Sequence, residues 1–441
     1  ITNEMTFYKA ELSVGSNKQK VGVLLDTGSS DLWVMGNDNP YCSHGSTLPL
    51  SKYRIPYQSL FSKSQDISKD AAVPESSQID CSIYGTFNKT ASTTFRNNGT
   101  SFHITYSDNT FAEGTWGHDT VTLNGLEIDD LSFVVANSSN SRVSVLGIGL
   151  SGLEVTYSGG IAGQQPYKYD NLPMKLKSDG YIGKNLYSLY LNSANATQGT
   201  VLFGGVDHAR YTGELVAIPL ENIYPLMYSV PITFDVKLKG VSFKDKVALP
   251  DEVTALLDSG TSLTFLPQIV VDNLIQLWDL TYWDEAAAYV GLCDAYSNQE
   301  LSFEFAGTTI NVPVSNFLRP LTYSNGTTSV NCSMGVIAAD RYVLGESFLR
   351  GAYVVYDLDD FQVYLAEADF DSTREDIVAV TSTIPEGGKS SSTVGSVPSS
   401  TNSSFSTTSS SIDSFSTTSS STDSFSTASS STDSFSTASS S

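Results

Sequence analysis

A short template built around an aspartate occurs twice in the chain, and it constrains the fold more than any other feature. The first copy reads Val-Gly-Val-Leu-Leu-Asp26-Thr-Gly-Ser-Ser and the second reads Val-Thr-Ala-Leu-Leu-Asp258-Ser-Gly-Thr-Ser. In each copy an apolar, strand-like run leads into the aspartate. A Val-Leu-Gly triplet follows each copy further along the chain, starting at Val145 and at Val343. These echoes indicate that the chain contains two related halves.

The template also suggests a chemistry. An aspartate at the end of a buried strand is costly unless it is hydrogen-bonded or functional. Two related halves that face each other would bring Asp26 and Asp258 together, and two close carboxyls keep one shared proton over a range of acidic pH. Such a pair can activate a water molecule for amide hydrolysis without a covalent intermediate. The glycine of each template allows a tight turn, and four hydroxyl residues are the expected donors to the carboxylates: Thr27, Ser29, Ser259 and Thr261.

Most of the chain reads as short strands separated by turn residues. Runs rich in Val, Ile, Leu, Phe and Tyr alternate with Gly, Asn, Asp and Ser, which is typical of an all-β protein. We expect strands at 6–14, 20–25, 101–106, 115–123, 200–203 and 352–356, and short helices near 173–178 and 270–277.

The duplication predicts two lobes followed by a tail. We expect an N-terminal lobe at 1–185 and a C-terminal lobe at 186–375. The segment 43–80 lies between two cysteines and reads as a surface loop inserted into the first lobe. Residues 376–441 are dominated by Ser and Thr, which bury too little apolar surface to fold, so we expect a disordered region there. An O-glycosylated stalk and a passive linker both fit this tail.

The chain is strongly acidic, with 24 Lys and Arg against 47 Asp and Glu and a net charge of −23. Such a surface repels phosphate backbones, so basic segments of proteins are expected partners and nucleic acid is not. No run of about 18 apolar residues is present to span a bilayer. The chain opens at Ile1 without a charged and apolar leader, which we interpret as a processed mature form.

Cysteines and glycosylation sequons indicate the secretory pathway. Cys42 and Cys81 are as far apart in sequence as Cys293 and Cys332, which predicts two local disulfides. Neither the cysteines nor the scattered histidines have the spacing of a metal site, so no metal is expected. Asn-X-Ser/Thr sequons predict glycosylation at Asn88, Asn98, Asn137, Asn195, Asn325, Asn331 and Asn402.

Further motifs carry a resemblance to a known family. The first template continues as Asp-Leu-Trp33-Val, Leu202-Phe-Gly-Gly-Val-Asp follows in the second half, and the second triplet extends to Val343-Leu-Gly-Glu-Ser-Phe-Leu-Arg-Gly-Ala-Tyr. With these motifs the chain resembles the pepsin-type aspartic proteases over residues 1–370. The resemblance implies a bilobal endopeptidase that needs no cofactor, works at acidic pH, binds an extended peptide between its lobes and is inhibited by pepstatin-type compounds.

The resemblance also implies site roles. The flap tyrosine of the family corresponds to Tyr106, with Trp33 supporting it from below, and Ser107 replaces the usual glycine at the flap tip. The remaining implied residues are the catalytic Asp26 and Asp258, the orienting Ser29 and Thr261, and the glycines near the substrate, Gly28 and Gly260.

Within the family, the chain looks most like the fungal yapsins. This likeness rests on Asn39-Pro-Tyr-Cys42, the long cysteine-bounded insertion and the Ser/Thr-rich tail. Yapsins are glycolipid-anchored and cleave beside Lys or Arg. The likeness implies a monomer outside the cell, at the cell surface or wall, that contacts the membrane only through a GPI anchor.

Two finer expectations follow from this likeness. Asp108, two positions after the flap tyrosine, would pair with a basic substrate side chain; a solvated turn aspartate is the alternative. The insertion, with basic residues such as Lys52 and Arg54, would be cut to give a two-chain form held by the Cys42–Cys81 bridge. An uncut surface loop fits the sequence equally well.

Two other functions remain open at this stage. A secreted aspartic protease of broad apolar specificity would differ only in its pocket. A non-catalytic, wall-associated binding protein would keep the lobes as a relic and use the tail. Intact aspartate templates in both halves favour the enzyme.

Overall fold

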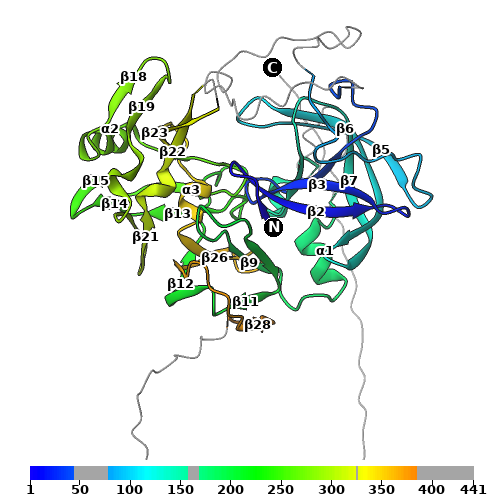
Figure 1. Cartoon of the computed structure of the whole chain (residues 1–441). Helices are drawn as coiled ribbons and strands as arrows, with labels where there is room; N and C mark the ends of the chain where they lie inside the picture. Colours follow the sequence, from blue (N-terminus) through cyan, green and yellow to red (C-terminus); the bar gives the residue numbers. More distant parts are fainter. Residues whose placement is uncertain (44–77, 157–167, 324–325, 385–441) are drawn as a thin grey trace, which may run out of the picture. The chain divides into compact units, whose positions relative to one another are not determined.

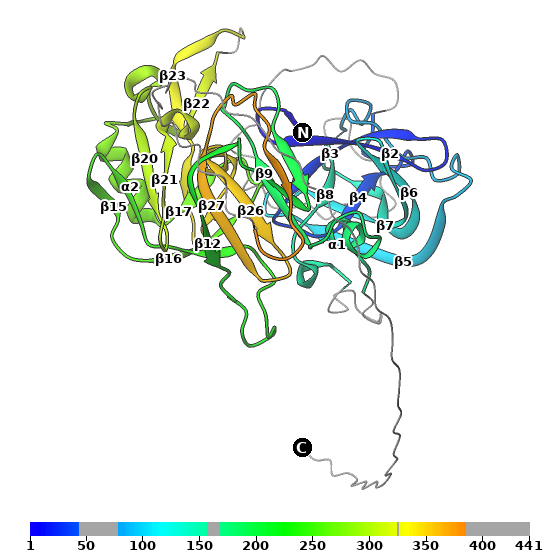
Figure 2. The same cartoon turned by 90° about the horizontal axis from the view of Figure 1, so that it is seen from below.

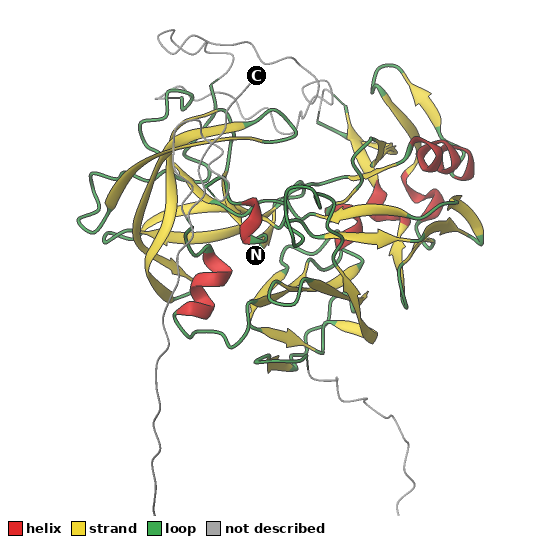
Figure 3. Ribbon diagram, turned by 180° about the vertical axis from the view of Figure 1, so that it is seen from behind, coloured by secondary structure: helices red, strands yellow, loops and turns green. Residues whose placement is uncertain are grey.

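The computed structural model describes residues 1–43, 78–156, 168–323 and 326–384 (Figure 1). Strands dominate, and the three α-helices within these ranges are short (Figure 3): α1 (Leu172–Ser178), α2 (Gln268–Leu277) and α3 (Glu346–Leu349). The all-β class predicted from the sequence is therefore confirmed. No helix in this described part is long and apolar enough to cross a membrane. Most of the predicted insertion, and the tail from residue 385, lie outside the described residues. The prediction of disorder from residue 376 is wrong for the first part of the tail, because β28 (Ile377–Ala379) pairs with β11 (Gly205–Asp207) and Val380 is buried.

The first half forms an eight-stranded sheet in the order β1-β2-β3-β8-β4-β7-β6-β5. β3 pairs in parallel with β8, so that Asp26 lies opposite Gly147. β4 is antiparallel to β8 and parallel to β7. The chain thus leaves the sheet at the first aspartate and returns on the other side of the same central strand. The strands are β1 (Thr2–Asn3), β2 (Tyr8–Val14), β3 (Gln19–Asp26), β4 (Leu32–Met35), β5 (Arg96–Thr105), β6 (Phe111–Leu123), β7 (Leu126–Ser139) and β8 (Ser144–Gly147).

The second half repeats this arrangement around the second aspartate. Its sheet has the order β13-β16-β25-β17-β24. β16 is parallel to β25, β25 is antiparallel to β17, and β17 is parallel to β24. The pairing directions match those of β3, β8, β4 and β7, as expected for a duplicated unit. The strands are β13 (Asp235–Leu238), β16 (Val253–Leu257), β17 (Thr264–Leu266), β24 (Val336–Ala338) and β25 (Val343–Leu344).

Four smaller sheets complete the described part. One of them has the strand order β10-β9-β26-β27-β12, and Figure 2 shows β9, β26 and β27 side by side. Its strands are β9 (Leu186–Tyr190), β10 (Thr200–Phe203), β12 (Tyr211–Pro219), β26 (Ala352–Asp357) and β27 (Gln362–Ala368). The others are β11 (Gly205–Asp207) with β28 (Ile377–Ala379); β14 (Gly240–Phe243), β15 (Lys246–Leu249), β20 (Glu300–Glu304) and β21 (Thr309–Pro313); and β18 (Thr281–Trp283), β19 (Ala288–Leu292), β22 (Leu318–Thr322) and β23 (Thr328–Met334).

Burial along the strands follows their position in the sheets. In β20 and β21 buried and solvent-facing residues alternate, which is the pattern of a sheet with one wet face. All six residues of β26 are buried, including the aspartate at its end, Asp357. Because a buried charge needs a partner, a group that pairs with Asp357 is expected beside it.

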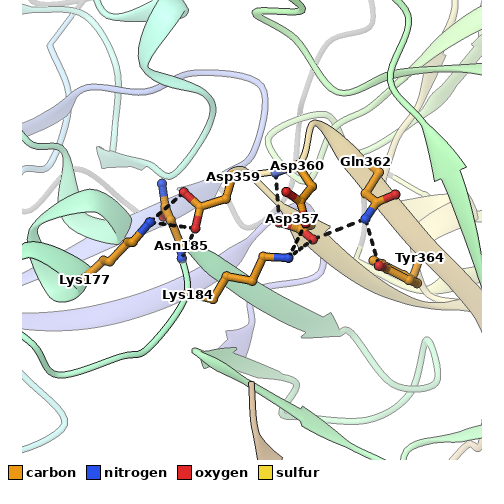
Figure 4. A network of polar contacts seen from close by, with 8 residues as sticks. All are labelled: Lys177, Lys184, Asn185, Asp357, Asp359, Asp360, Gln362 and Tyr364. Carbon is orange, nitrogen blue, oxygen red and sulfur yellow. Dashed lines mark hydrogen bonds and ion pairs between the residues drawn. The ribbon is translucent and has the colours of Figure 1, made fainter. Parts of the chain in front are cut away.

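A polar network supplies that partner at the turn between β26 and β27 (Figure 4). Buried Lys184 contacts Asp357 and Asp360, with both Nζ–Oδ2 distances 2.6 Å. Burial acts to lower the pKa of Lys184, but its hydrogen bonds to the two aspartates outweigh this and raise the pKa. Beside it, Lys177 of α1 contacts Asp359 at 2.7 Å. The network fastens α1 and the segment before β9 to the β26–β27 turn.

The two disulfides are those predicted from the cysteine spacing. Cys42 is bonded to Cys81 and Cys293 to Cys332. The first closes the base of the inserted segment, and the second joins β23 to the residue that follows β19. Each closed loop constrains the unfolded chain and stabilises the fold by about 4 kcal/mol on chain-entropy grounds.

Candidate active site

Each of the two aspartates lies at the end of a partly buried strand. Asp26 is the last residue of β3, and Asp258 comes directly after β16. The loop after each aspartate crosses so close to the central strand that no side chain fits there. A Cβ added at Gly147 would lie 2.6 Å from a backbone nitrogen of the first loop, and one at Gly345 would lie 2.1 Å from a carbonyl oxygen of the second. This close approach explains why a Val-Leu-Gly triplet accompanies each template.

Each carboxylate is held by two donors from its own loop. The backbone N–H two residues after the aspartate donates to one oxygen, and the hydroxyl three residues after it donates to the other. The distances are 2.8 Å for Gly28 N to Asp26 Oδ1 and for Gly260 N to Asp258 Oδ1, and 2.5 Å for Ser29 Oγ to Asp26 Oδ2 and for Thr261 Oγ1 to Asp258 Oδ2. The two aspartates therefore have equivalent first partners.

The two carboxyl groups face each other. Asp26 is 5% exposed and Asp258 is 9% exposed, and their side chains are within hydrogen-bonding reach. A Cβ added at Gly28 would lie 2.6 Å from Asp258 Oδ1, and one at Gly260 would lie 2.3 Å from Asp26 Oδ1. Burial and then the charge of Asp258 raise the pKa of Asp26, while hydrogen bonds from Ser29 and Gly28 act in the opposite direction. This geometry allows the pair to share a proton.

The prediction that all four template hydroxyls hold the carboxylates is wrong for two of them. Thr27 Oγ1 donates to the carbonyl of Leu257 at 3.1 Å, and Ser259 Oγ donates to the carbonyl of Leu25 at 2.8 Å. Each hydroxyl also accepts a hydrogen bond from the other residue's backbone. The N–H of Ser259 donates to Thr27 Oγ1 at 2.9 Å, and the N–H of Thr27 donates to Ser259 Oγ at 3.1 Å. Both residues are buried between the two halves. These four bonds join one loop to the other, so the two hydroxyls pair with backbone groups of the facing half instead of with a carboxylate.

The β5–β6 hairpin carries the predicted flap residues. Trp33 Nε1 donates to the hydroxyl of Tyr106 at 2.8 Å. Burial, and then the charge of Asp26, raise the pKa of Tyr106 well above its usual value, so the phenol keeps its proton. Asp108 is exposed at the turn, where its Oδ1 accepts from the backbone and the hydroxyl of Thr110 at 2.9 and 2.7 Å. The hairpin thus places a neutral phenol and an exposed carboxylate at its end.

A second buried acidic pair adjoins the first loop, and the sequence reasoning missed it. Asp31 accepts from the Tyr169 hydroxyl at 2.5 Å and from the Val155 N–H at 3.0 Å. Burial raises its pKa to about 6. Glu154 is 3% exposed, and neither of its carboxyl oxygens has a hydrogen-bond partner among the described residues. Burial, and then the charge of Asp31, raise the pKa of Glu154 to about 9. The available signal was a glutamate inside the apolar run Gly-Leu-Glu-Val.

A second missed feature is the loop between β12 and β13. Residues 222–234 include no charged side chain, although the whole chain carries −23. Leu226 is 100% exposed and Met227 is 70% exposed. In Figure 2 this loop projects beyond the strands. An uncharged run in so acidic a chain was the signal that could have identified it.

The predicted glycosylation sites lie in varied surroundings. Asn98, Asn137 and Asn195 are exposed, whereas Asn88 and Asn331 are half-buried. Asn325 and Asn402 lie outside the described residues. Glycosylation stays a prediction at all of them.

Comparisons with known proteins agree with this geometry. The family model "Eukaryotic aspartyl protease" matches residues 7–368. Among curated proteins, aspartic proteinase 3 of Saccharomyces cerevisiae is 42% identical over 431 residues, covering 88% of this chain and 74% of that protein. Aspartic proteinase yapsin-3 of the same yeast is 40% identical, covering 87% and 70%. Secreted aspartic protease 9 of Candida albicans is 34% identical, covering 86% and 80%.

A solved structure supports the fold independently. The aspartic proteinase from Irpex lacteus superposes with a TM-score of 0.64 at 20% identity, covering 84% of this chain and 97% of that one. At this identity the likeness speaks for the pepsin-like fold. The family model and the yeast relatives carry the assignment further: the chain belongs to the eukaryotic aspartyl protease family and is an aspartic endopeptidase related to the yapsins.

Proposed function

We propose that Asp26 and Asp258 together hydrolyse peptide bonds by activating one water molecule held between them. In the resting pair one carboxyl is charged and the other is protonated. The charged member takes a proton from the water as its oxygen attacks the scissile carbonyl carbon, and the protonated member donates to the carbonyl oxygen. Collapse of the tetrahedral intermediate then returns a proton to the leaving amine. The observation that carries this proposal is the facing pair of buried carboxyls with matched donors.

The neighbouring residues have supporting roles in this proposal. Ser29 and Thr261 fix the outer carboxylate oxygens, so that the inner oxygens face the water. Gly28 and Gly260 lie near the substrate in this proposal, and the lack of a side chain at each leaves room for the carboxyl group of the facing aspartate. Tyr106, supported by Trp33, closes over the substrate, and its neutral phenol is available as a hydrogen-bond donor.

Substitution of the pair tests the proposal. Asp26→Asn and Asp258→Asn each remove one acid–base group, which is typically worth about 10²–10⁴-fold in rate. Cleavage of a basic peptide hormone is measured at pH 4–6 for wild type and both variants, with and without a pepstatin-type inhibitor. We expect inhibitable cleavage by wild type and its loss in both variants. Absence of inhibitable cleavage by wild type would favour the non-catalytic, wall-associated binding protein.

We propose further that the enzyme prefers Lys or Arg beside the scissile bond, with Asp108 as the partner of the basic side chain. Two observations support this: the carboxylate is exposed at the end of the flap hairpin, and both of its hydrogen bonds involve the same oxygen, Oδ1. In Asp108→Ala we expect a peptide library to show a weaker preference for Lys over Leu before the cut. An unchanged Lys/Leu ratio would leave broad apolar specificity as the better description.

We propose that the protein acts outside the cell, at the cell surface or wall, as a GPI-anchored and glycosylated monomer. Its two disulfides suit an oxidising compartment, and one relative is named a secreted protease. The same proposal includes a lobe boundary at 185, a second lobe that extends past 375 to include β28, and cleavage within 43–80 to a two-chain form. Release of activity from intact cells by a phosphoinositide-specific phospholipase C tests the anchor, and reducing electrophoresis tests the two-chain form.

A further inference from the structure

The uncharged loop 222–234, called here the β12–β13 loop, is closed at its base. The backbone N–H of Glu221 donates to the carbonyl of Asp235 at 2.7 Å. Closed surface loops of this length are often functional. Nothing in the pair of aspartate templates accounts for this loop.

Its C-terminal root contacts the segments around both aspartates. A Cβ added at Gly152 would lie 2.3 Å from Cγ2 of Ile232, so the root packs tightly against that segment. The same segment accepts a hydrogen bond from Ser30 Oγ, at the carbonyl of Leu150 and a distance of 2.7 Å. On the other side, the N–H of Leu257, the residue before the second aspartate, donates to the carbonyl of Phe234 at 3.0 Å. The C-terminal end of the loop therefore contacts segments that are bonded to, or directly precede, the two catalytic loops.

The outer part of the loop is ordered and apolar. Asn222 holds both ends of the turn, donating from Nδ2 to the carbonyl of Tyr228 at 2.7 Å and accepting from the N–H of Tyr224 at 3.0 Å. The N–H groups of Met227 and Tyr228 both donate to the carbonyl of Tyr224 at 3.0 Å. These bonds keep Leu226 and Met227 in solvent rather than folded back onto the protein.

We propose that the β12–β13 loop is an accessory binding surface for an apolar stretch of the substrate polypeptide, lying outside the residues that immediately flank the scissile bond. The inference rests on the function proposed above. Six residues of extended chain reach about 20 Å, so a substrate leaving the catalytic pair passes over adjoining loops. Contact with an apolar substrate segment would remove the side chains of Leu226 and Met227 from water, which is favourable in free energy. The rest of the chain is acidic, so the uncharged loop is the more suitable surface for such a segment.

The test compares substrates within one enzyme. The probes are a core peptide of eight residues and the same peptide extended at either end by six residues that are apolar (Leu, Val, Tyr) or polar (Ser, Gln). For wild type we expect kcat/KM at least tenfold higher for one apolar-extended peptide than for its polar-extended counterpart, mainly through KM. In the double variant Leu226→Ser/Met227→Ser we expect this ratio to fall to within twofold of one.

A matched control changes two exposed apolar residues elsewhere. Leu292→Ser/Val330→Ser removes side chains that are also mostly exposed, on β19 and β23, and should keep the wild-type ratio. A ratio near one in wild type overturns the inference, as does an equal loss of the ratio in both double variants. The inference is also overturned if the loop proves necessary for binding to phosphatidylcholine vesicles, or for dimerisation, while kcat/KM is the same for the apolar-extended and polar-extended peptides. If wild type cleaves none of the peptides, the proposed function itself fails.

Discussion

Replacing Glu154 with glutamine should stabilise the protein at neutral pH and leave its stability at acidic pH unchanged. The carboxyl group is buried, neither oxygen has a hydrogen-bond partner in the part of the chain that the structure describes, and Asp31 lies nearby. Burial is the main reason that its pKa rises from 4.5 to about 9, with the charge of Asp31 next. Glutamine has a neutral amide of the same size, which fills the same space. Because the amide does not ionise, burial carries no penalty for a charged form.

The size of the effect follows from proton linkage. Below pH 4.5 the carboxyl is protonated in both the folded and the unfolded chain, so it costs nothing. As pH rises through 4.5 the unfolded chain releases its proton while the folded chain retains it until about pH 9. The free energy of unfolding therefore falls with pH across this window. At pH 7, some 2.5 pH units above the unfolded value, the penalty amounts to at most about 3 kcal/mol.

Urea unfolding at pH 4 and pH 7 measures this difference. Both proteins should also carry Asp258→Asn, so that autolysis does not interfere. Tryptophan fluorescence is a suitable signal, because Trp33 and Trp116 belong to the hydrophobic cluster that contains Tyr169 and against which Val155 packs. The control is Glu300→Gln, which changes an exposed glutamate on β20.

The refuting result is specific. If Glu154→Gln shifts stability by the same amount at pH 4 and pH 7, the carboxyl is not held neutral in the folded protein. A destabilisation that grows with pH would reverse the sign of the argument and would mean that the ionised form has a partner.

Three further expectations concern the catalytic pair and the contacts around it. Because burial and the charge of Asp258 raise the pKa of Asp26, the pair keeps its shared proton from acidic pH up to that raised pKa, and kcat/KM should fall about tenfold per pH unit only above it; a profile that falls from the ordinary pKa of an aspartate, or one flat to pH 9, would contradict this. Thr27→Val leaves two buried backbone groups of the facing loop unpaired and should lower the free energy of unfolding by about 1–3 kcal/mol, measurable by denaturant unfolding. Lys184→Met leaves the buried charge of Asp357 without its lysine partner and should lower the free energy of unfolding by about 3–5 kcal/mol. Lys177→Met removes one member of an exposed ion pair and should lower it by under about 1 kcal/mol in the same assay.

The duplicated framework could be predicted because its causes are local in sequence. An apolar run followed by Asp, a hydroxyl residue and Gly specifies a buried strand ending in a tight turn, and the second copy specifies the same unit again. The predicted strand at 200–203 coincides with β10, and the predicted helix at 270–277 lies within α2. The equal cysteine spacings likewise identify the two disulfides.

Contacts between the halves could not be predicted, because they depend on which groups meet in space. Thr27 and Ser29 are both hydroxyl residues next to the same aspartate, and nothing in their local sequence says that one bonds the carboxylate while the other crosses to Leu257. The burial of Glu154 could not be predicted for a related reason. An acid in an apolar run is ordinarily placed on the surface, and only the packing of the chain around Asp31 buries it.

The exceptions to ordinary sequence rules lie together. Glu154 is buried without a hydrogen-bond partner in the described part of the chain, and the exposed Leu226 leaves apolar surface in water. Both belong to segments that flank the catalytic loops, and these segments touch each other where Gly152 meets Ile232. Local departures from stable design are expected at functional sites, where they are tolerated for what they do. The two segments are therefore better regarded as one unit beside the catalytic pair, and substitutions in one should be examined for effects on the other.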